Sequence, residues 1–184
     1  MRLSENRYEK DKLSHHVALR FLQHDARTQL IRRWTGISDN RIRKLYNSYL
    51  RQTKCVPRHR GKSPHQVAIF ARTLRMQQEA AWLASLFALL GVIPAEPSPE
   101  AALDLPGLMR GNLLCDAFET YRAMVPSAQI SFDHAVFLAT TLAQGVRLRF
   151  ATCLDCGSLL VIDPLSLRDR RCYQCGHQLS KASI

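Results

Sequence analysis

The sequence predicts a mainly α-helical protein with a small cysteine-rich module at its C-terminal end. Three observations support this fold class. Apolar residues recur at helical spacing through much of the chain, a strongly basic arm precedes an apolar middle, and two Cys-x-x-Cys-Gly pairs stand near the end. These features predict a basic helical region at 1–62, an apolar helical region at 63–145 and the cysteine module at 146–184.

Charge is distributed very unevenly along the chain. The 184 residues include 26 Lys and Arg against 15 Asp and Glu, which gives a formal net charge of +11 at pH 7. Residues 1–75 hold 18 basic and 5 acidic side chains, residues 76–146 hold 2 and 7, and residues 147–184 hold 6 and 3. Because solubility alone would not confine the excess to one arm, we expect a polyanion such as nucleic acid to bind there.

The segment 26–54 predicts two short helices around a turn at Gly36. Apolar residues recur at helical spacing before the turn, and Ser38 or Asp39 can cap a second helix after it. The expected buried side of this second helix is Ile42, Leu45, Tyr46 and Tyr49. Together with an earlier helix around 13–22, this makes a helix-turn-helix pattern.

The opposite side of the second helix has the side chains that contact base edges and phosphates. Arg pairs bidentately with guanine and Asn with adenine, while Lys binds phosphates. We expect DNA contacts from this helix, from the end of the helix before it and from the basic segment after it. The expected DNA-binding residues are Arg32, Arg33, Asn40, Arg41, Arg43, Lys44, Asn47, Arg51, Lys54, Arg58, Arg60 and Lys62. A basic helix face that is merely solvated is the alternative interpretation.

The cysteine module has the spacing C-x2-C-x15-C-x2-C. The four residues are Cys153, Cys156, Cys172 and Cys175. This spacing is typical of a four-thiolate zinc site, because two Cys-x-x-Cys turns supply the tetrahedral set that zinc prefers. Strand-like segments at 146–152 and 158–164 flank the first pair, so we expect a zinc ribbon with one structural Zn(II) per chain.

The residues around the cysteines fit this interpretation. Gly157 and Gly176 follow the second cysteine of each pair, where a positive φ would tighten the turn. Cations that can offset the charge of four thiolates follow at Arg168, Arg170 and Arg171. A closed four-cysteine shell leaves no position for a reactive water, so no catalytic zinc is expected. A disulfide-exchange enzyme is the alternative, although such enzymes use one Cys-x-x-Cys pair in a βαβ context.

The middle of the chain predicts helices that form the core and dock a partner. We expect one long helix at 65–90, a proline-rich connection at 94–107, and helices at 108–124 and 131–142. The longest apolar run is shorter than a membrane span, and no apolar signal follows the charged first residues, so we expect a cytoplasmic protein without membrane contact. No catalytic triad, phosphate loop or carboxylate pair indicates an enzyme.

Taken together, these features resemble the FlhC family, the C subunits of the bacterial flagellar master transcription activator. The resemblance rests on SDNRIRKLYNSYLR at 38–51, GKSP at 61–64, the helical middle, and the segments CLDCGSLLVI and CYQC around the cysteines. It implies that the four cysteines bind zinc and that the N-terminal arm contacts promoter DNA. It also implies assembly with a small helical FlhD-like subunit into a hetero-oligomer that recruits RNA polymerase.

One segment departs from the family pattern. Flagellar members have an aromatic-rich stretch after the Ser-Pro segment, whereas this chain has HQVAIFARTLRM. Related activators of conjugative plasmids and integrative elements share the architecture, so the resemblance implies control of flagellar or of conjugative-transfer operons. The alternative function is an RNA- or ribosome-associated zinc ribbon protein. It is less favoured because inward-facing Tyr46 and Tyr49 would leave few aromatics to stack on unpaired bases.

Overall fold

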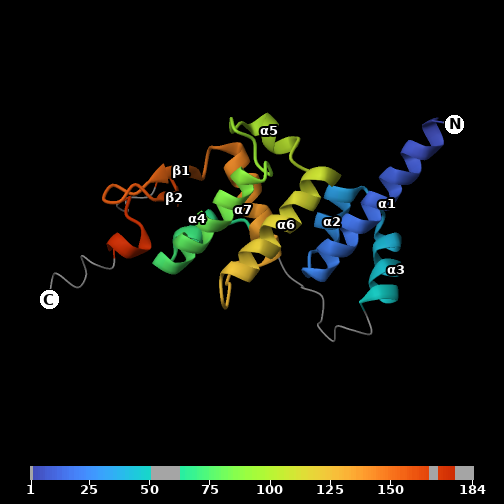
Figure 1. Ribbon diagram of the computed structural model, residues 1–184, viewed down its shortest axis with the longest axis horizontal. Helices are drawn as coiled ribbons and strands as arrows, with labels where there is room; N and C mark the ends of the chain where they lie inside the picture. The colour runs from blue at the N-terminus through green and yellow to red at the C-terminus, as the bar shows by residue number, and fades with distance from the viewer. Residues whose placement is uncertain (1, 51–62, 166–169, 177–184) are drawn as a thin grey trace.

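The structure, a computed structural model, describes residues 2–50, 63–165 and 170–176, and it is mainly helical as predicted (Figure 1). At the N-terminal end, α1 and α2 pack against α6 and α3 packs against α1 and α2, while a β-hairpin lies at the other end of the elongated molecule, next to α4. The described elements are α1 (Arg2–Gln23), α2 (Thr28–Thr35), α3 (Asp39–Tyr49), the 3-10 helix η1 (Val67–Ala71), α4 (Leu74–Leu89), α5 (Pro99–Leu103), α6 (Leu108–Met124), α7 (Phe132–Gln144), β1 (Arg149–Thr152) and β2 (Leu159–Ile162).

Helices α2 and α3 lie on either side of the turn at Gly36, as the sequence predicts. Gly36 has a φ of +72° and ends α2, with its amide donating to the carbonyl of Arg32 at 2.9 Å. A left-handed residue at this place favours glycine, which has no Cβ to clash. Ser38 is the residue that precedes α3, in extended conformation. We refer to α1, α2 and α3 together as the arm.

The arm shares one hydrophobic core with the middle of the chain. Phe21 of α1 packs edge-on against Phe132 of α7, with ring centroids 4.8 Å apart, and Trp34 of α2 lies 5.9 Å from Phe21. Phe118 of α6 reaches the same Phe132 at 5.1 Å. All four aromatic side chains are buried. Aromatic packing of this kind holds the arm against α6 and α7, in addition to the chain segments that connect them.

Ion pairs surround this aromatic junction. Arg20 of α1 binds the carboxylates of Asp116 and Glu119 on α6, each at 2.7 Å. At the start of α2, Arg27 Nε donates to Asp133 at the start of α7, at 2.6 Å. The sequence does not reveal these pairs, because their partners are about a hundred residues apart and no local spacing links them.

The expected single helix at 65–90 is wrong, because it is interrupted after η1. Thr73 takes an extended conformation, and its side chain accepts a hydrogen bond from the amide of Met76 at 3.1 Å, so that α4 begins at Leu74. A side-chain cap of this kind satisfies one of the free amides of a new helix and therefore favours a boundary there. The expected apolar face is also only partly buried, since Trp82 is 43% and Leu89 81% exposed.

Helix α4 contains a buried carboxylate that sequence reasoning did not identify. Glu79 is 1% exposed and accepts hydrogen bonds from the hydroxyl of Tyr121, from the amide of Gln129 at 2.8 Å and from Arg75 Nε at 2.9 Å. Burial raises the pKa of a carboxyl group, but the hydrogen bonds and the Arg75 charge together outweigh it and lower the pKa of Glu79. The carboxylate thereby ties α4 to α6 and to the segment before α7.

The remaining elements match their predictions closely. Helix α6 has the expected bounds, and Ser131 caps α7. Strands β1 and β2 pair antiparallel, with Phe150 opposite Val161, and β2 packs against α4. None of the helices in the described part of the chain combines the length and the apolar character that a membrane crossing requires.

Candidate metal centre and basic helix face

One cysteine pair lies in the turn between β1 and β2 and the other follows β2, and the two pairs converge on one point. The ligand atoms of Cys153, Cys156, Cys172 and Cys175 all lie within 4.8 Å of one another. The closest recorded pair is Cys156 Sγ and Cys172 Sγ, at 3.5 Å. Four sulfurs at such distances can hold one metal ion, as the spacing in the sequence predicts.

Backbone hydrogen bonds shape the first cysteine turn. The amide of Cys153 donates to the carbonyl of Ser158 at 2.8 Å, and the amide of Gly157 donates back to Cys153 at 3.0 Å. Gly157 has the expected positive φ of +71°. The same expectation is wrong for Gly176, which ends a helical turn at 173–176 and has no positive φ. The second pair therefore presents its sulfurs from a helical turn and not from a glycine-dependent loop.

Amides directed at the sulfurs favour the thiolate form of two cysteines. The amide of Cys175 lies 3.5 Å from Cys172 Sγ, and this contact is the main cause that lowers the pKa of Cys172 to about 6. The pKa of Cys153 is also lowered, chiefly by the amide of Cys156. In contrast, hydrogen bonds with the sulfurs of Cys156 and Cys172 raise the pKa of Cys175. Four crowded sulfurs retain a proton in the absence of a cation, and a bound metal ion supplies positive charge in its place.

The expected cations of the module are only partly described. Arg171 forms an ion pair with Asp155 at 3.1 Å, and the carbonyl of Arg170 accepts the amide of Leu154 at 2.9 Å. Both contacts connect the second cysteine pair to the first. Arg168 lies outside the described residues.

Cys115 is a cysteine of a different kind. It lies fully buried in α6, and burial raises the pKa of its thiol to about 12. A thiol of this kind stays protonated near neutral pH and is a poor nucleophile and a poor metal ligand.

The basic side of α3 is exposed, while its apolar side packs into the core. Ile42 is fully buried and Leu45 packs against the core. The expected DNA-binding residues in this region that are exposed are Arg32, Arg33, Asn40, Arg41, Arg43, Lys44 and Asn47. The other expected contacts, Arg51, Lys54, Arg58, Arg60 and Lys62, lie outside the described residues.

Two details of α3 were not predicted. Arg41 pairs with Asp11 of α1 at 3.3 Å, where both side chains are 53% exposed. Tyr46 packs partly against the core, but Tyr49 is 62% exposed, so the expectation that it faces inward is wrong. Tyr49 stands in the last turn of α3.

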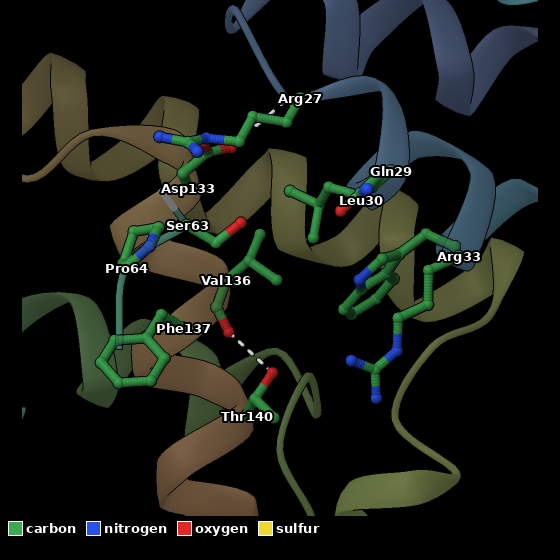
Figure 2. Close-up of a pocket in the computed structure, with 11 residues that line it drawn as sticks. Arg27, Gln29, Leu30, Arg33, Ser63, Pro64, Asp133, Val136, Phe137 and Thr140 are labelled. Carbon is green, nitrogen blue, oxygen red and sulfur yellow. Dashed lines mark hydrogen bonds and ion pairs between the residues drawn. The ribbon is translucent and has the colours of Figure 1, made fainter. Parts of the chain in front are cut away.

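A cavity of about 250 Å³ lies beside the arm, between α2, α7 and the segment that begins at Ser63 (Figure 2). Leu30, Val136 and Phe137 form its apolar part. Arg33 stands at one side, and the pair formed by Arg27 and Asp133 stands at another. The sequence did not predict this cavity, because its walls come from segments far apart in the chain, and Arg33 was expected only as a DNA contact.

No model of a known protein family matches this chain, and no curated protein sequence matches it.

Proposed function

We propose that this protein is a non-catalytic DNA-binding subunit of a transcription activator. The observation that carries the proposal is the exposed polar side of α3, where Arg43, Lys44 and Asn47 project from a helix that Ile42 anchors in the core. A helix held in this way can enter the major groove, where Arg and Asn distinguish base pairs through their edges. The turn at Gly36 joins it to α2 in the order of a helix-turn-helix.

The charge of the arm supports the same proposal. Residues 1–50, which contain the arm, hold 11 basic and 5 acidic side chains, and phosphate contacts supply much of the affinity of DNA-binding proteins. Arg32 and Arg33 of α2 are exposed beside α3 and would bind the backbone while α3 contacts bases. Sequence preference then depends on α3, and general affinity depends on the whole arm.

The metal that the four cysteines would hold is a structural Zn(II), one per chain. The four thiolate ligands form a closed set, which is typical of zinc sites that stabilise a fold and do not catalyse. The amides near Cys153 and Cys172 favour the thiolates that zinc requires. Metal analysis of the purified protein tests this assignment, and an iron-sulfur cluster or a stoichiometry other than one zinc would contradict it.

The partners of the subunit follow from the resemblance to the FlhC family. They are a FlhD-like helical subunit in a hetero-oligomer and RNA polymerase, and the targets are promoters of flagellar or conjugative-transfer operons in the cytoplasm. Large apolar side chains on α4 and α6, namely Trp82, Leu89, Met109 and Met124, are exposed and support docking of a partner.

The decisive experiment selects duplexes from a random library with the purified protein and then compares variants on the selected site. Arg43→Ala should lose about 1–3 kcal/mol, or roughly 5- to 150-fold in affinity, at one base pair. Arg110→Ala removes the same charge from α6 at a residue that donates to Asp104, and it should not change the preference. Failure to enrich any sequence, or unchanged binding of both Arg43→Ala and Asn47→Ala, would overturn the proposal.

Chromatin immunoprecipitation in the native host tests the targets. Enrichment at discrete promoters would identify the operons and decide between flagellar and transfer genes. A diffuse signal, or recovery with RNA, would contradict promoter activation.

The exposed position of Tyr49 favours a second candidate function, RNA binding. An aromatic side chain beside basic residues can stack on an unpaired base. Competition between a duplex and single-stranded RNA of the same length separates the two functions. Preference for RNA, with weaker binding by Tyr49→Ala, would favour this second candidate.

A further inference from the structure

The cavity beside the arm continues into a second one on the side away from Arg33. The second cavity has a volume of about 450 Å³ and shares Arg27, Ser63 and Pro64 with the first. Its other walls include His65 and Arg72. The two cavities therefore form one groove that runs from α2 across the start of α7 to the end of η1.

A further arginine extends this groove toward the cysteine module. Both terminal guanidinium nitrogens of Arg147 lie 3.4 Å from the carbonyl oxygen of His65. Arg147 is exposed and stands two residues before β1. Four exposed basic residues thus follow one another from the arm to the module, and we call them the basic strip: Arg33, His65, Arg72 and Arg147.

The acidic residues at 76–146 do not neutralise most of this strip. Among the residues that line the two cavities, the only acid is Asp133, which is mostly buried and paired with Arg27 at 2.6 Å. Asp116 and Glu119 bind Arg20 on α1, and Glu79 is a buried residue of α4.

The remaining acids stand near α5. Glu100 and Asp104 lie in α5 and at its end. Glu96 precedes α5, next to Pro97, which packs against Gly145.

We propose that the basic strip binds the phosphate backbone of duplex DNA in addition to the contacts of α3. The inference rests on the proposed function and extends it, because none of His65, Arg72 and Arg147 belongs to the arm. An acidic peptide is disfavoured as the occupant, since the cations come from separate segments spread along an open surface. Such a line of cations matches the repeated charges of a phosphate backbone and contributes affinity without sequence preference.

The salt dependence of binding to a random-sequence duplex tests this inference. The probe is a fluorescent 30-base-pair duplex, and affinity is measured by anisotropy over a series of KCl concentrations. The double variant Arg72→Gln/Arg147→Gln should lower the slope of log affinity against log salt by about 0.9 for each phosphate that it no longer neutralises, or about 1.8 for two phosphates. Its affinity should fall by the same factor on the random duplex and on the selected site.

Two further variants separate charge from structure. Arg72→Lys/Arg147→Lys keeps both charges and should keep the wild-type slope, because a phosphate accepts an ammonium as well as a guanidinium. Arg122→Gln removes one charge from the last turn of α6, outside the arm and the basic strip, and should also keep the slope.

Each remaining outcome contradicts the inference. If the glutamine double variant keeps the wild-type slope, the strip does not contact DNA, while loss of site preference in Arg43→Ala would leave the proposed function intact. If the lysine variant is as weak as the glutamine variant, the arginines act through the fold. If the wild-type protein does not bind the duplex, or binds single-stranded RNA more tightly, both the proposed function and this inference fail.

Discussion

The arm and the cysteine module are held in place by different forces. The arm buries Phe21 and Trp34 against aromatic side chains of α6 and α7, and ion pairs surround that contact. The module is a two-stranded hairpin with few buried side chains, among them Leu160 and Val161, and a short turn that carries the second cysteine pair. A two-stranded hairpin is at best marginally stable by itself. Apolar burial therefore stabilises the arm, whereas the module depends on its packing against α4 and on the proposed metal.

Removal of the metal should have the largest effect, because it should unfold the module and leave the helices of the arm folded. Structural zinc sites contribute on the order of 10 kcal/mol of apparent binding free energy, and this energy is also folding energy. A chelator or Cys172→Ser should therefore release the metal and expose the amides of β1 and β2 to hydrogen exchange, while the helical circular dichroism signal remains. Cys115→Ala is the matched control and should keep one metal per chain. Full protection of the hairpin without metal would show that α4 alone stabilises the module.

Truncation of the aromatic junction should destabilise the arm and leave the metal content of the module unchanged. Phe132→Ala removes the ring that both Phe21 and Phe118 contact, at a cost of about 3–5 kcal/mol in the free energy of unfolding. Urea denaturation measures this decrease, and metal content should stay unchanged. Leu103→Ala, at a residue 73% exposed, should stay within about 0.5 kcal/mol of wild type. A loss of metal in Phe132→Ala would contradict the separation of the two regions.

Replacement of the buried carboxylate of Glu79 should destabilise the packing of α4, the helix against which the module lies. Glu79→Gln removes charged hydrogen bonds with Tyr121 and Arg75, at a cost of about 2–3 kcal/mol near neutral pH. Because the folded-state pKa of Glu79 lies below its usual 4.5, the carboxylate stabilises the fold above about pH 4.5, and this stability is lost as the pH falls through the folded-state pKa. The difference in unfolding free energy between wild type and variant should therefore shrink in acid. A pH-independent difference would contradict this account.

The smallest effect should come from the ion pair between α3 and α1. Arg41 and Asp11 are both half exposed, and exposed pairs contribute at most about 1 kcal/mol. Asp11→Asn should therefore change the unfolding free energy by less than that amount. It should nevertheless tighten DNA binding at low salt, because it removes a competing anion from the proposed contact surface. Unchanged DNA affinity would indicate that Arg41 does not contact DNA.

Local sequence signals predicted the elements that have clear ends. Helix α6 begins after Pro106 and Gly107 and ends shortly before Pro126, and the predicted bounds match. The cluster of four cysteines was also predicted, because the spacing of the cysteines is itself the signal. The identity of the metal and the DNA contacts stay predictions.

Features that depend on distant partners could not be predicted in the same way. Glu79 follows Gln77 and Gln78, so nothing in the local sequence marks it as buried, and only the fold brings Tyr121 and Gln129 to it. Tyr49 is exposed although it falls at helical spacing with the buried Ile42, because periodicity does not determine how far along a helix the neighbouring elements pack. The basic strip is another such case, because α3 separates Arg33 from His65 in the sequence, and α4 to α7 separate Arg72 from Arg147.

The shared core of the arm has a consequence for synthesis of the protein. Arg27 and Asp133 are 106 residues apart, and the aromatic side chains next to them are separated by similar lengths of chain. At translation rates of about 5–20 residues per second, Phe21 and Trp34 would emerge roughly 5–20 s before the residues that cover them. During that interval the basic, apolar arm is exposed on the nascent chain. Chaperones or the nucleic acid around the ribosome are then its first available partners.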